Sequence, residues 1–443
     1  MKTRELADIL NGSRGERLLE NLYGREAVGR ERLRYLNLTE GMAAEGATSD
    51  EIRLFSAPGR TELGGNHTDH NRGRVLAAAV QMDAVAAVTP RADSNIFFRS
   101  AGYNDTVIRL DGAADLLPKP EEKETTAALI RGIASEFAAR GERIGGFNAN
   151  VSSTVLQGSG LSSSAALEVL IAKIFDSLYG KGRRCAIELA QIGQKAENVF
   201  FGKPCGLMDQ AASASGGAVA IDFADPASPV VQQIEFDPLA AGFALCVVNT
   251  RGNHADLTPD YAAIPAEMNS VARFFGKSFL RETDLSAVLA RAAEIRKAAG
   301  DRALLRAIHF FNEDSRAADM ALALEDLASA EGEEKKREAM ARFLRLANES
   351  GASSQELLQN IYSPGDPGVQ EISLALAVSR EFFKERKITG VSRVHGGGFA
   401  GTIQTYVPAG DLDSYKDRME TLFGEGALTV LRVRQAGAIE IEF

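Results

Sequence analysis

The spacing of apolar residues along the chain predicts a mixed fold of helices and strands. Apolar side chains that recur three and four residues apart indicate helices, and short apolar runs between polar or glycine-rich stretches indicate strands. The segments with helical spacing are 1–50, 125–140, 163–179 and 189–201. The segments with strand character are 52–56, 75–80, 84–88, 96–99 and 147–152. Residues 1–50, with Leu18, Leu19 and Leu22 on one face, are expected to form an amphipathic helical segment that packs on the main body.

The pattern changes in the second half of the chain. A buried strand is expected at 243–249, long helices rich in Ala, Leu, Glu and Arg at 264–348, and further strands at 391–393, 402–407 and 428–433. We therefore predict an α+β protein of two unequal lobes, with the boundary near 215–242. The predicted units are a helical segment (1–50), an N-terminal domain (51–220) and a C-terminal domain (243–443).

Composition narrows the class of protein. The 443 residues are 45% hydrophobic and 25% charged, which is ordinary for a globular chain. The net charge of −10 argues against a general nucleic-acid-binding protein, since such proteins cluster Lys and Arg. No apolar run reaches the roughly 18 residues of a membrane span. Three cysteines and a charged N-terminal stretch favour a reduced, cytoplasmic setting.

A glycine- and serine-rich segment, VLQGSGLSSSAALEVL at 155–170, is the strongest chemical signal. A glycine turn that leads into a helix presents backbone N–H groups and the positive end of the helix dipole to a phosphate. A capped helix after a glycine turn is the structural alternative. The segment is neither a P-loop nor a dinucleotide-binding fingerprint. The residues expected to hold phosphate are Gly158, Ser159, Gly160, Leu161, Ser162, Ser163 and Ser164.

A second polar segment, SAPGRTELGGNHTDHNRG at 56–73, combines an arginine, carboxylates, an amide and imidazoles among glycines. Such groups suit the hydroxyls of an uncharged sugar, and Arg60 could steady phosphoryl charge. Two alternatives stay open for this segment. One is a metal site formed by His67, Asp69 and His70, and the other is a solvated polar loop.

Three segments together resemble the GHMP kinase superfamily, and within it the galactokinase family. They are GSGLSSSAALEVL, the C-terminal glycine segment HGGGFAGT (395–402), and ELAQIGQKAENVFFGKPCGLMDQAAS (188–213). Segment 56–73 is similar to the galactokinase signature GRxNxIGEHxDYxxG. The resemblance covers roughly residues 52–435. It implies a two-lobed fold with the active site in the cleft between the lobes, and ATP-dependent phosphorylation of the anomeric hydroxyl of galactose.

The resemblance also implies roles for single residues. Asp209 would be the catalytic base and Arg60 its charge-stabilising partner. Mg²⁺ would be held by Ser164 and Glu197. The sugar would be bound by Asn66, His67, Asp69, Gly206 and Tyr261, and ATP by the segment 158–164. The expected ligands are thus galactose, ATP and Mg²⁺, with no nucleic acid and no membrane. His309 is expected to be structural.

Three polar positions of the chain depart from the family pattern. Asn66 stands where the family has Glu, Glu62 where it has Asn, and His70 where it has Tyr. The family's Glu at the first of these positions helps hold the hydroxymethyl end of the sugar. Two alternatives to galactose phosphorylation therefore stay open, a GHMP kinase for another sugar or sugar acid and a non-catalytic sugar sensor.

Overall fold

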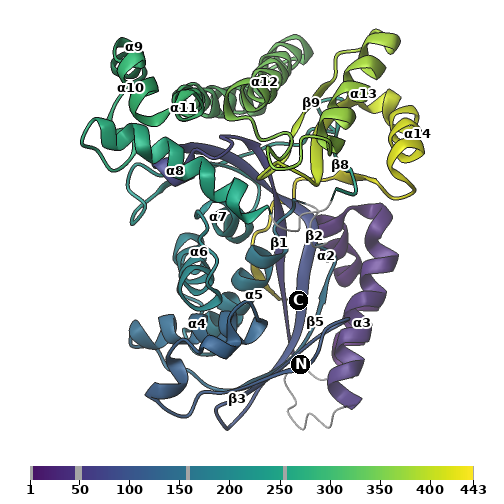
Figure 1. Cartoon of the computed structure of the whole chain (residues 1–443). Coiled ribbons are helices and arrows are strands. Elements are labelled where there is room, and N and C mark those ends of the chain that lie inside the picture. Colours follow the sequence, from purple (N-terminus) through teal and green to yellow (C-terminus); the bar gives the residue numbers. More distant parts are fainter. Residues whose placement is uncertain (1–2, 45–51, 156–159, 253–256, 443) are drawn as a thin grey trace.

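A computed structural model describes residues 3–44, 52–155, 160–252 and 257–442 of the chain. It consists of a lower lobe built on a large sheet and an upper lobe built on a smaller one (Figure 1). The helices are α1 (Thr3–Asn11), α2 (Ser13–Tyr23), α3 (Val28–Ala44), α4 (Thr126–Ala139), α5 (Ser163–Leu178), α6 (Ala186–Lys195), α7 (Met208–Ser215), α8 (Thr258–Phe274), α9 (Leu285–Ala290), α10 (Ala292–Ala299), α11 (Asp301–Ser329), α12 (Glu333–Ser353), α13 (Glu371–Arg386) and α14 (Leu412–Phe423).

The large sheet has eight described strands, in the order β12-β1-β2-β5-β3-β4, with β6 beside the start of β2 and β7 beside β6. Its strands are β1 (Arg53–Gly64), β2 (Arg74–Pro90), β3 (Asn95–Ser100), β4 (Thr106–Arg109), β5 (Phe147–Ser153), β6 (Ala218–Asp222), β7 (Val230–Ile234) and β12 (Ile439–Ile441). Only the β3–β5 pairing is parallel among the described strands of this sheet. The long strands β1 and β2 run from the base of this lobe up to the second lobe (Figure 1).

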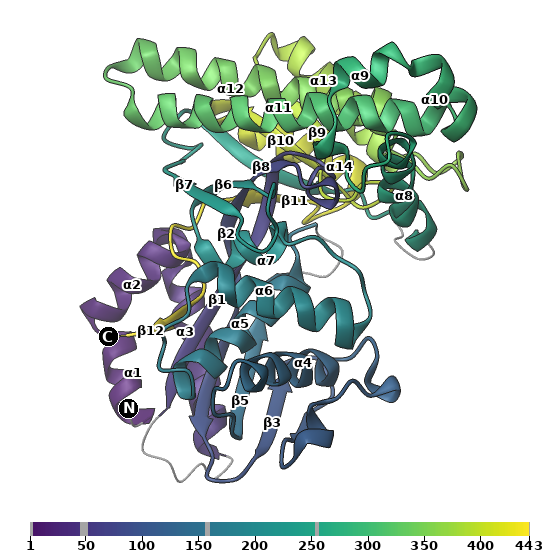
Figure 2. The ribbon, with the colours of Figure 1, turned by 90° about the vertical axis from the view of Figure 1, so that its left-hand side faces the viewer.

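Both faces of the large sheet are covered, which is why its strands are apolar on both sides. Helices α4, α5, α6 and α7 lie on one face, and α1, α2 and α3 lie on the other (Figures 1 and 2). The N-terminal helices bury Leu10, Leu19 and Tyr35 against Leu54 and Val85 of the sheet. Helices α1, α2 and α3 thus form a layer of the lower lobe within residues 3–44.

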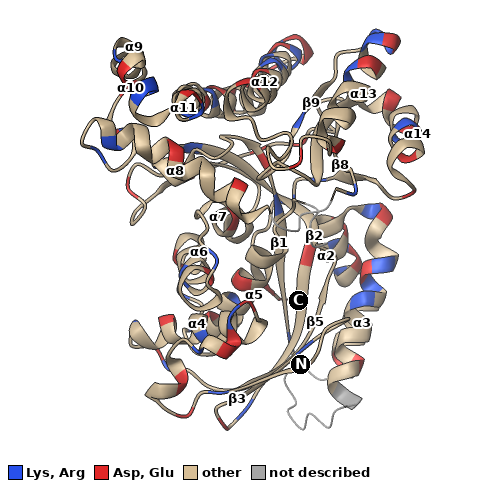
Figure 3. Ribbon diagram, viewed as in Figure 1, with Lys and Arg blue, Asp and Glu red and all other residues tan. Residues whose placement is uncertain are grey.

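The second lobe is built on a four-stranded antiparallel sheet in the order β11-β8-β10-β9. Its strands are β8 (Phe243–Asn249), β9 (Val391–Val394), β10 (Thr402–Pro408) and β11 (Leu428–Leu431). The long helices α11 and α12 lie across the top of the molecule (Figure 2). Basic and acidic residues are interspersed along the outer helices of both lobes (Figure 3). None of the described helices is long and apolar enough to cross a membrane.

Two of the predicted boundaries need correction. Segment 215–242 is not a plain connection, because β6 and β7 within it extend the large sheet. The C-terminal unit does not hold the whole of 243–443, because β12 returns to pair with β1 through Leu54–Ile441 and Ser56–Ile439. Strand β12 is only three residues long, so an apolar run could not reveal it. The lobes also share one core, in which Met320 and Phe343 join residues of the large sheet.

Candidate active site

Arg60 and Asp209 form a two-pronged ion pair where the two predicted motifs meet. The Nε of Arg60 donates to Asp209 Oδ1 at 2.7 Å, and its Nη2 donates to Oδ2 at 2.6 Å. The Arg60 side chain is 8% exposed and that of Asp209 is 30% exposed. The carboxylate is thus fixed in direction by the guanidinium and still reaches open space, as a catalytic base requires.

Irregular backbone near each of the two residues sets the direction of their side chains. The β1–β2 register shifts between Pro58 and Arg60, and such a bulge changes the direction of the side chains near it. Asp209 lies in the first turn of α7, after the turn that contains Pro204 and Gly206. The remaining guanidinium nitrogen, Arg60 Nη1, donates to the carbonyl of Gly160 at 2.5 Å. Arg60 therefore connects Asp209 to the segment 158–164, which is expected to hold phosphate.

The first residues of α5 complete this centre. Ser162 has φ 59°, a left-handed conformation that is uncommon for a residue with a side chain. Its hydroxyl donates to Asp209 Oδ2 at 2.7 Å. The side chain of Ser162 thus binds Asp209 in the structure, whereas the sequence analysis assigned Ser162 to ATP binding. The backbone N–H groups of Ser163 and Ser164 belong to the first turn of α5, which has no intrahelical acceptors for them. Gly158 and Ser159 lie outside the described residues.

The electrostatics keep Asp209 ionised. Burial alone would raise its pKa, but the ion pair with Arg60 and the hydrogen bond from Ser162 outweigh burial and hold the pKa below its ordinary value. Lys203 adds positive charge nearby, and its own pKa is raised, because attraction to Glu197 and Asp209 outweighs its partial burial.

Glu197 lies in a π-helical turn, Ala196–Phe201, that continues α6. The amide of Gln210, next to the base in the chain, donates to Glu197 Oε2 at 3.0 Å and to Glu168 Oε2 at 2.9 Å. Burial and the neighbouring Glu197 raise the pKa of Glu168 well above its ordinary value. Two buried oxygens of this cluster, Glu168 Oε1 and Gln210 Oε1, have no hydrogen-bond partner among the described residues. This cluster of buried carboxyl and amide oxygens offers the kind of ligand that a hard cation prefers.

The sugar-binding segment reaches the same centre through Asp69. A Cβ added to Gly206 would lie 1.8 Å from Asp69 Oδ2, so a larger residue at this position would displace the Asp69 carboxylate. The Asp69 side chain is 10% exposed and accepts a hydrogen bond from the backbone N of His70 at 3.0 Å. Asp69 therefore lies beside Gly206, which precedes Asp209 by three residues in the chain.

His67 and Tyr261 contact the C-terminal glycine segment. His67 Nε2 lies 3.1 Å from the Gly397 carbonyl oxygen, and burial lowers the pKa of His67 to about 3. The Tyr261 hydroxyl donates to the Gly398 carbonyl at 3.0 Å, and its ring meets Phe399 edge to face. Both residues therefore brace the glycine segment with their polar atoms.

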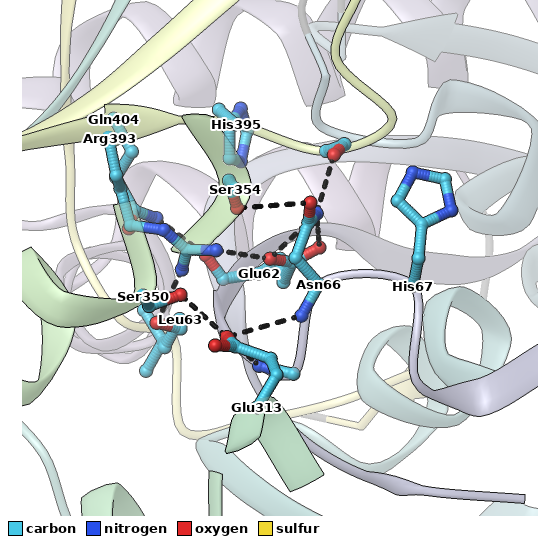
Figure 4. A network of polar contacts seen from close by, with 12 residues as sticks. Glu62, Leu63, Asn66, His67, Glu313, Ser350, Ser354, Arg393, His395 and Gln404 are labelled. Atoms are coloured by element: carbon cyan, nitrogen blue, oxygen red, sulfur yellow. Dashed lines mark hydrogen bonds and ion pairs between the residues drawn. The ribbon is translucent and has the colours of Figure 1, made fainter. Parts of the chain in front are cut away.

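Asn66 is fully buried within a polar network beneath this segment (Figure 4). Its side-chain amide contacts Glu62, Gly396, Ser354 and Asn360. The structure therefore places Asn66 among protein groups on every side. His309 is also buried. Its Nε2 donates to the Asn66 carbonyl oxygen at 2.9 Å, and its Nδ1 lies 2.8 Å from the Ser353 hydroxyl. The prediction that His309 is structural agrees with these contacts.

Several residues near the site escaped sequence reasoning. The His395 ring lies between two threonine hydroxyls, with Nε2 2.9 Å from Thr61 Oγ1 and Nδ1 3.1 Å from Thr402 Oγ1. A Cβ added to Gly160 would lie 2.6 Å from His395 Nδ1. Burial and the nearby Arg60 lower the pKa of His395 to about 3. Glu168 falls one helical turn after Ser164, and Lys203 and Gln210 flank the acid in the matched segment. These positions relative to Ser164 and Asp209 were the signals in the sequence that could have identified Glu168, Lys203 and Gln210.

Two further observations bear on alternatives. Among the described residues, no group of three or more His, Cys, Asp or Glu side chains is arranged to hold a metal ion. The proposed site of His67, Asp69 and His70 is therefore not supported. A separate hollow of about 460 Å³ lies between α2, β7 and β11, lined by Asn21, Gln233 and Val430 among others, and contains none of the predicted site residues.

Comparison with known proteins agrees with this geometry. Residues 128–217 match the family model described as GHMP kinases N terminal domain, and residues 44–90 match the model described as Galactokinase galactose-binding signature. The chain is 32% identical over 434 residues to a galactokinase from Streptomyces coelicolor, covering 97% of each chain.

Solved structures show the same fold. The galactokinase of Lactococcus lactis in complex with galactose aligns with a TM-score of 0.74 at 23% identity, over 91% of this chain and 99% of that one. A mevalonate kinase from Methanococcus jannaschii aligns with a TM-score of 0.57 at 15% identity, over 86% and 98%.

Proposed function

Because this chain belongs to the galactokinase family of GHMP kinases, we propose that it transfers the terminal phosphoryl group of ATP to the anomeric hydroxyl of galactose, with Asp209 as base. The observation that carries the assignment of the base is the two-pronged pair between Arg60 and Asp209. The pair, with the contact of Arg60 to Gly160, joins segments 56–73, 158–164 and 188–213 at one point.

In this proposal the sugar lies against Asp69, Gly206 and His67, with its anomeric hydroxyl toward Asp209. The ionised carboxylate accepts the hydroxyl proton as the sugar oxygen attacks the terminal phosphorus of ATP. Arg60 keeps the carboxylate in place and offsets negative charge on the transferring group. Holding both reactants in line accounts for roughly 7–11 kcal/mol of barrier reduction.

ATP phosphates would lie at the N-terminus of α5. Ser163 and Ser164 present first-turn backbone N–H groups that have no acceptor within the helix, and the dipole of the 16-residue helix favours an anion. This local positive end answers the difficulty that a chain of net charge −10 must bind a polyphosphate. The left-handed Ser162 turns its hydroxyl away from the phosphates toward Asp209, so its expected contribution to ATP is limited to its backbone.

The residues present fit a magnesium ion. Glu197 is buried, and unused oxygens of Glu168 and Gln210 lie in the same cluster. Mg²⁺ takes one or two protein oxygens together with substrate phosphates and water. We propose that Glu197 and the hydroxyl of Ser164 hold it. When bound, it would supply charge neutralisation at the ATP phosphates. A cytoplasmic location is likewise a proposal, which rests on the cysteine content.

Identification of the product tests this function. The full chain is incubated with ATP, MgCl₂ and galactose, and the product is followed by phosphorus and proton NMR. We expect galactose 1-phosphate, seen as coupling of the anomeric proton to phosphorus. Glucose, mannose and galacturonate serve as comparison acceptors. Phosphorylation at another hydroxyl, or a faster reaction with another acceptor, would overturn the assignment of galactose.

A further inference from the structure

The two main departures from the family signature are in direct contact. The Nδ2 of Asn66 lies 3.2 and 3.0 Å from the two carboxylate oxygens of Glu62. The family pattern places Asn at the position of Glu62 and Glu at the position of Asn66. The chain therefore keeps one amide and one carboxylate at this contact but exchanges their places, so the two departures are a single paired change.

The Glu62 carboxylate is held from the other side by an arginine. Arg393 Nη2 donates to Glu62 Oε1 at 2.6 Å, and the side chains are 1% and 2% exposed. Arg393 Nη1 donates to the Leu63 carbonyl at 2.6 Å. A buried charge requires such a partner. The carboxylate at position 62 is thus committed to protein contacts.

Asn66 has no polar atom left for a ligand. Besides Glu62, its Nδ2 donates to the Gly396 carbonyl at 2.8 Å, and its Oδ1 accepts from Asn360 at 2.9 Å. Its relative exposure is 0%. An amide has two donor hydrogens, and both have acceptors here. Figure 4 shows this side chain enclosed by residues of both lobes, with His67 pointing away from the network.

The backbone at Asn66 is fixed by the second lobe as well. Glu313 of α11 accepts from the backbone N of Gly65 at 3.0 Å, and His309 of α11 contacts the Asn66 carbonyl at 2.9 Å. Ser350 of α12 also contacts Glu313, at 2.5 Å. Every anchor of Asn66 except Glu62 thus comes from the second lobe.

We propose that Asn66, together with Glu62, is a positioning residue that fixes the sugar-binding loop to the C-terminal lobe and does not contact the sugar. The proposal rests on the proposed function only for its consequence on specificity. Recognition of the hydroxymethyl group, which the family assigns to a Glu at this position, is not made by Asn66. Substitution of Asn66 should then change kcat/KM by the same factor for sugars that differ only at carbon 6.

A double-mutant cycle tests the contact without any assay of activity. Asn66→Asp places a second carboxylate about 3 Å from Glu62, so the melting temperature should fall by several degrees. In Glu62→Gln with Asn66→Asp the amide and the carboxylate are exchanged. We expect the double variant to lose less than the sum of the two single losses. Additive losses would overturn the proposal.

Asn95→Asp is the matched control for this cycle. Asn95 Nδ2 donates to Asp93 Oδ2 at 2.9 Å, the same type of contact at the protein surface. Water screens the repulsion there, so its melting temperature should stay within about one degree of the wild type. An equal fall in the control variant would mean that the loss in Asn66→Asp is not specific to the buried contact, and would count against the proposal.

The second test compares sugars. We measure kcat/KM for galactose and for 6-deoxygalactose with the wild type, Asn66→Ala and Asn360→Ala. A positioning role predicts that each substitution lowers both values by the same factor, so their ratio changes less than twofold. A fall of tenfold or more in the ratio for Asn66→Ala would show direct contact and overturn the proposal. If the wild type used neither sugar, the proposed function would fail, while the thermal cycle would still decide the role of Asn66.

Discussion

Asp209 is the proposed catalytic base, and its pH behaviour follows from its neighbours. Its pKa lies below the ordinary value, because Arg60 and Ser162 offset the effect of burial. The carboxylate is therefore ionised at neutral pH and becomes protonated only below the usual range of about 3.9. Burial lowers the pKa values of His67 and His395 to about 3, so both imidazoles are neutral at neutral pH.

The Ser162→Ala variant tests this account of Asp209. Loss of the hydroxyl removes one donor from the carboxylate, so the pKa should rise and the acid limb of kcat/KM should move to higher pH, by less than about one unit. The measurement is the initial-rate kcat/KM for the sugar from about pH 2.5 to 8.5, so that the range includes the acid limb of the wild type. Ser228→Ala, at an exposed loop position, should leave the limb in place. A limb that stays fixed or moves to lower pH in Ser162→Ala would contradict the assigned hydrogen bond.

At this scale the sequence predicted the types of residue better than their contacts. Arg60 and Asp209 were singled out through the resemblance to the galactokinase family, and the structure brings them together. The contacts of Asn66 could not be predicted, because its partners Ser354 and Gly396 lie 288 and 330 residues away in the chain. Side-chain periodicity carries no information about such distances.

Among the elements, β2 shows why some strands were predicted too short. The sequence indicated separate strands at 75–80 and 84–88, since Asp83 interrupts the apolar run. The structure has one continuous strand, because Asp83 is fully buried and paired with Arg34 at 2.7 Å and Arg434 at 2.9 Å. These partners lie 49 and 351 residues away. Short strands such as β4 and β12 were missed because three or four residues show no clear alternation.

The same ion cluster ties α2 and α3 to the sheet, and Asp83→Asn tests it. Tyr23 of α2 also donates to Asp83 at 2.7 Å. Removing the charge leaves two buried arginines without their shared partner, which should cost about 3–5 kcal/mol of unfolding free energy. The measurement is urea unfolding at pH 7. Arg345→Ala, which breaks an exposed pair with Glu349, should change stability by less than about 0.5 kcal/mol.

The pKa of Asp83 gives this cluster a pH dependence. Burial would raise the pKa, but Arg34 and Arg434 hold it below the ordinary value. A lowered pKa contributes stability that is present above the unfolded value of about 3.9 and is lost as pH falls through the folded value. The difference in stability between wild type and Asp83→Asn should therefore shrink below about pH 4. A loss under about 1 kcal/mol at pH 7 would show that the cluster does not hold the helices.

For the whole molecule, the shared core predicts joint unfolding of the two lobes. Phe343 of α12 is fully buried and packs against Phe236 and Tyr406, with ring centroids 5.4 and 5.5 Å apart. Phe343→Ala should cost about 3–5 kcal/mol. We expect one calorimetric transition for the wild type and one, at lower temperature, for the variant. Two separate transitions in the wild type would contradict a common core.

The two-lobed α+β architecture was predicted from the sequence, but its finer layout was not. The GHMP fold itself came from the resemblance, whereas periodicity gave only the class. The returning strand β12 and the shared core depend on contacts between distant segments, which no local pattern encodes. The net charge of −10 was also informative, because a chain with this charge can bind a polyphosphate only where positive charge is concentrated locally. Arg60, Lys203 and the start of α5 supply that field.

The turnover of Asp209→Asn tests the central claim most directly. Asparagine keeps the size of the side chain and cannot accept the proton, so kcat with galactose and ATP should fall by about 10²–10⁴-fold. Galactose affinity, measured by calorimetry, should change less than about fivefold, and Asp225→Asn at an exposed position should keep wild-type kcat. A kcat for Asp209→Asn within about threefold of the wild type would contradict the assignment of Asp209 as the base.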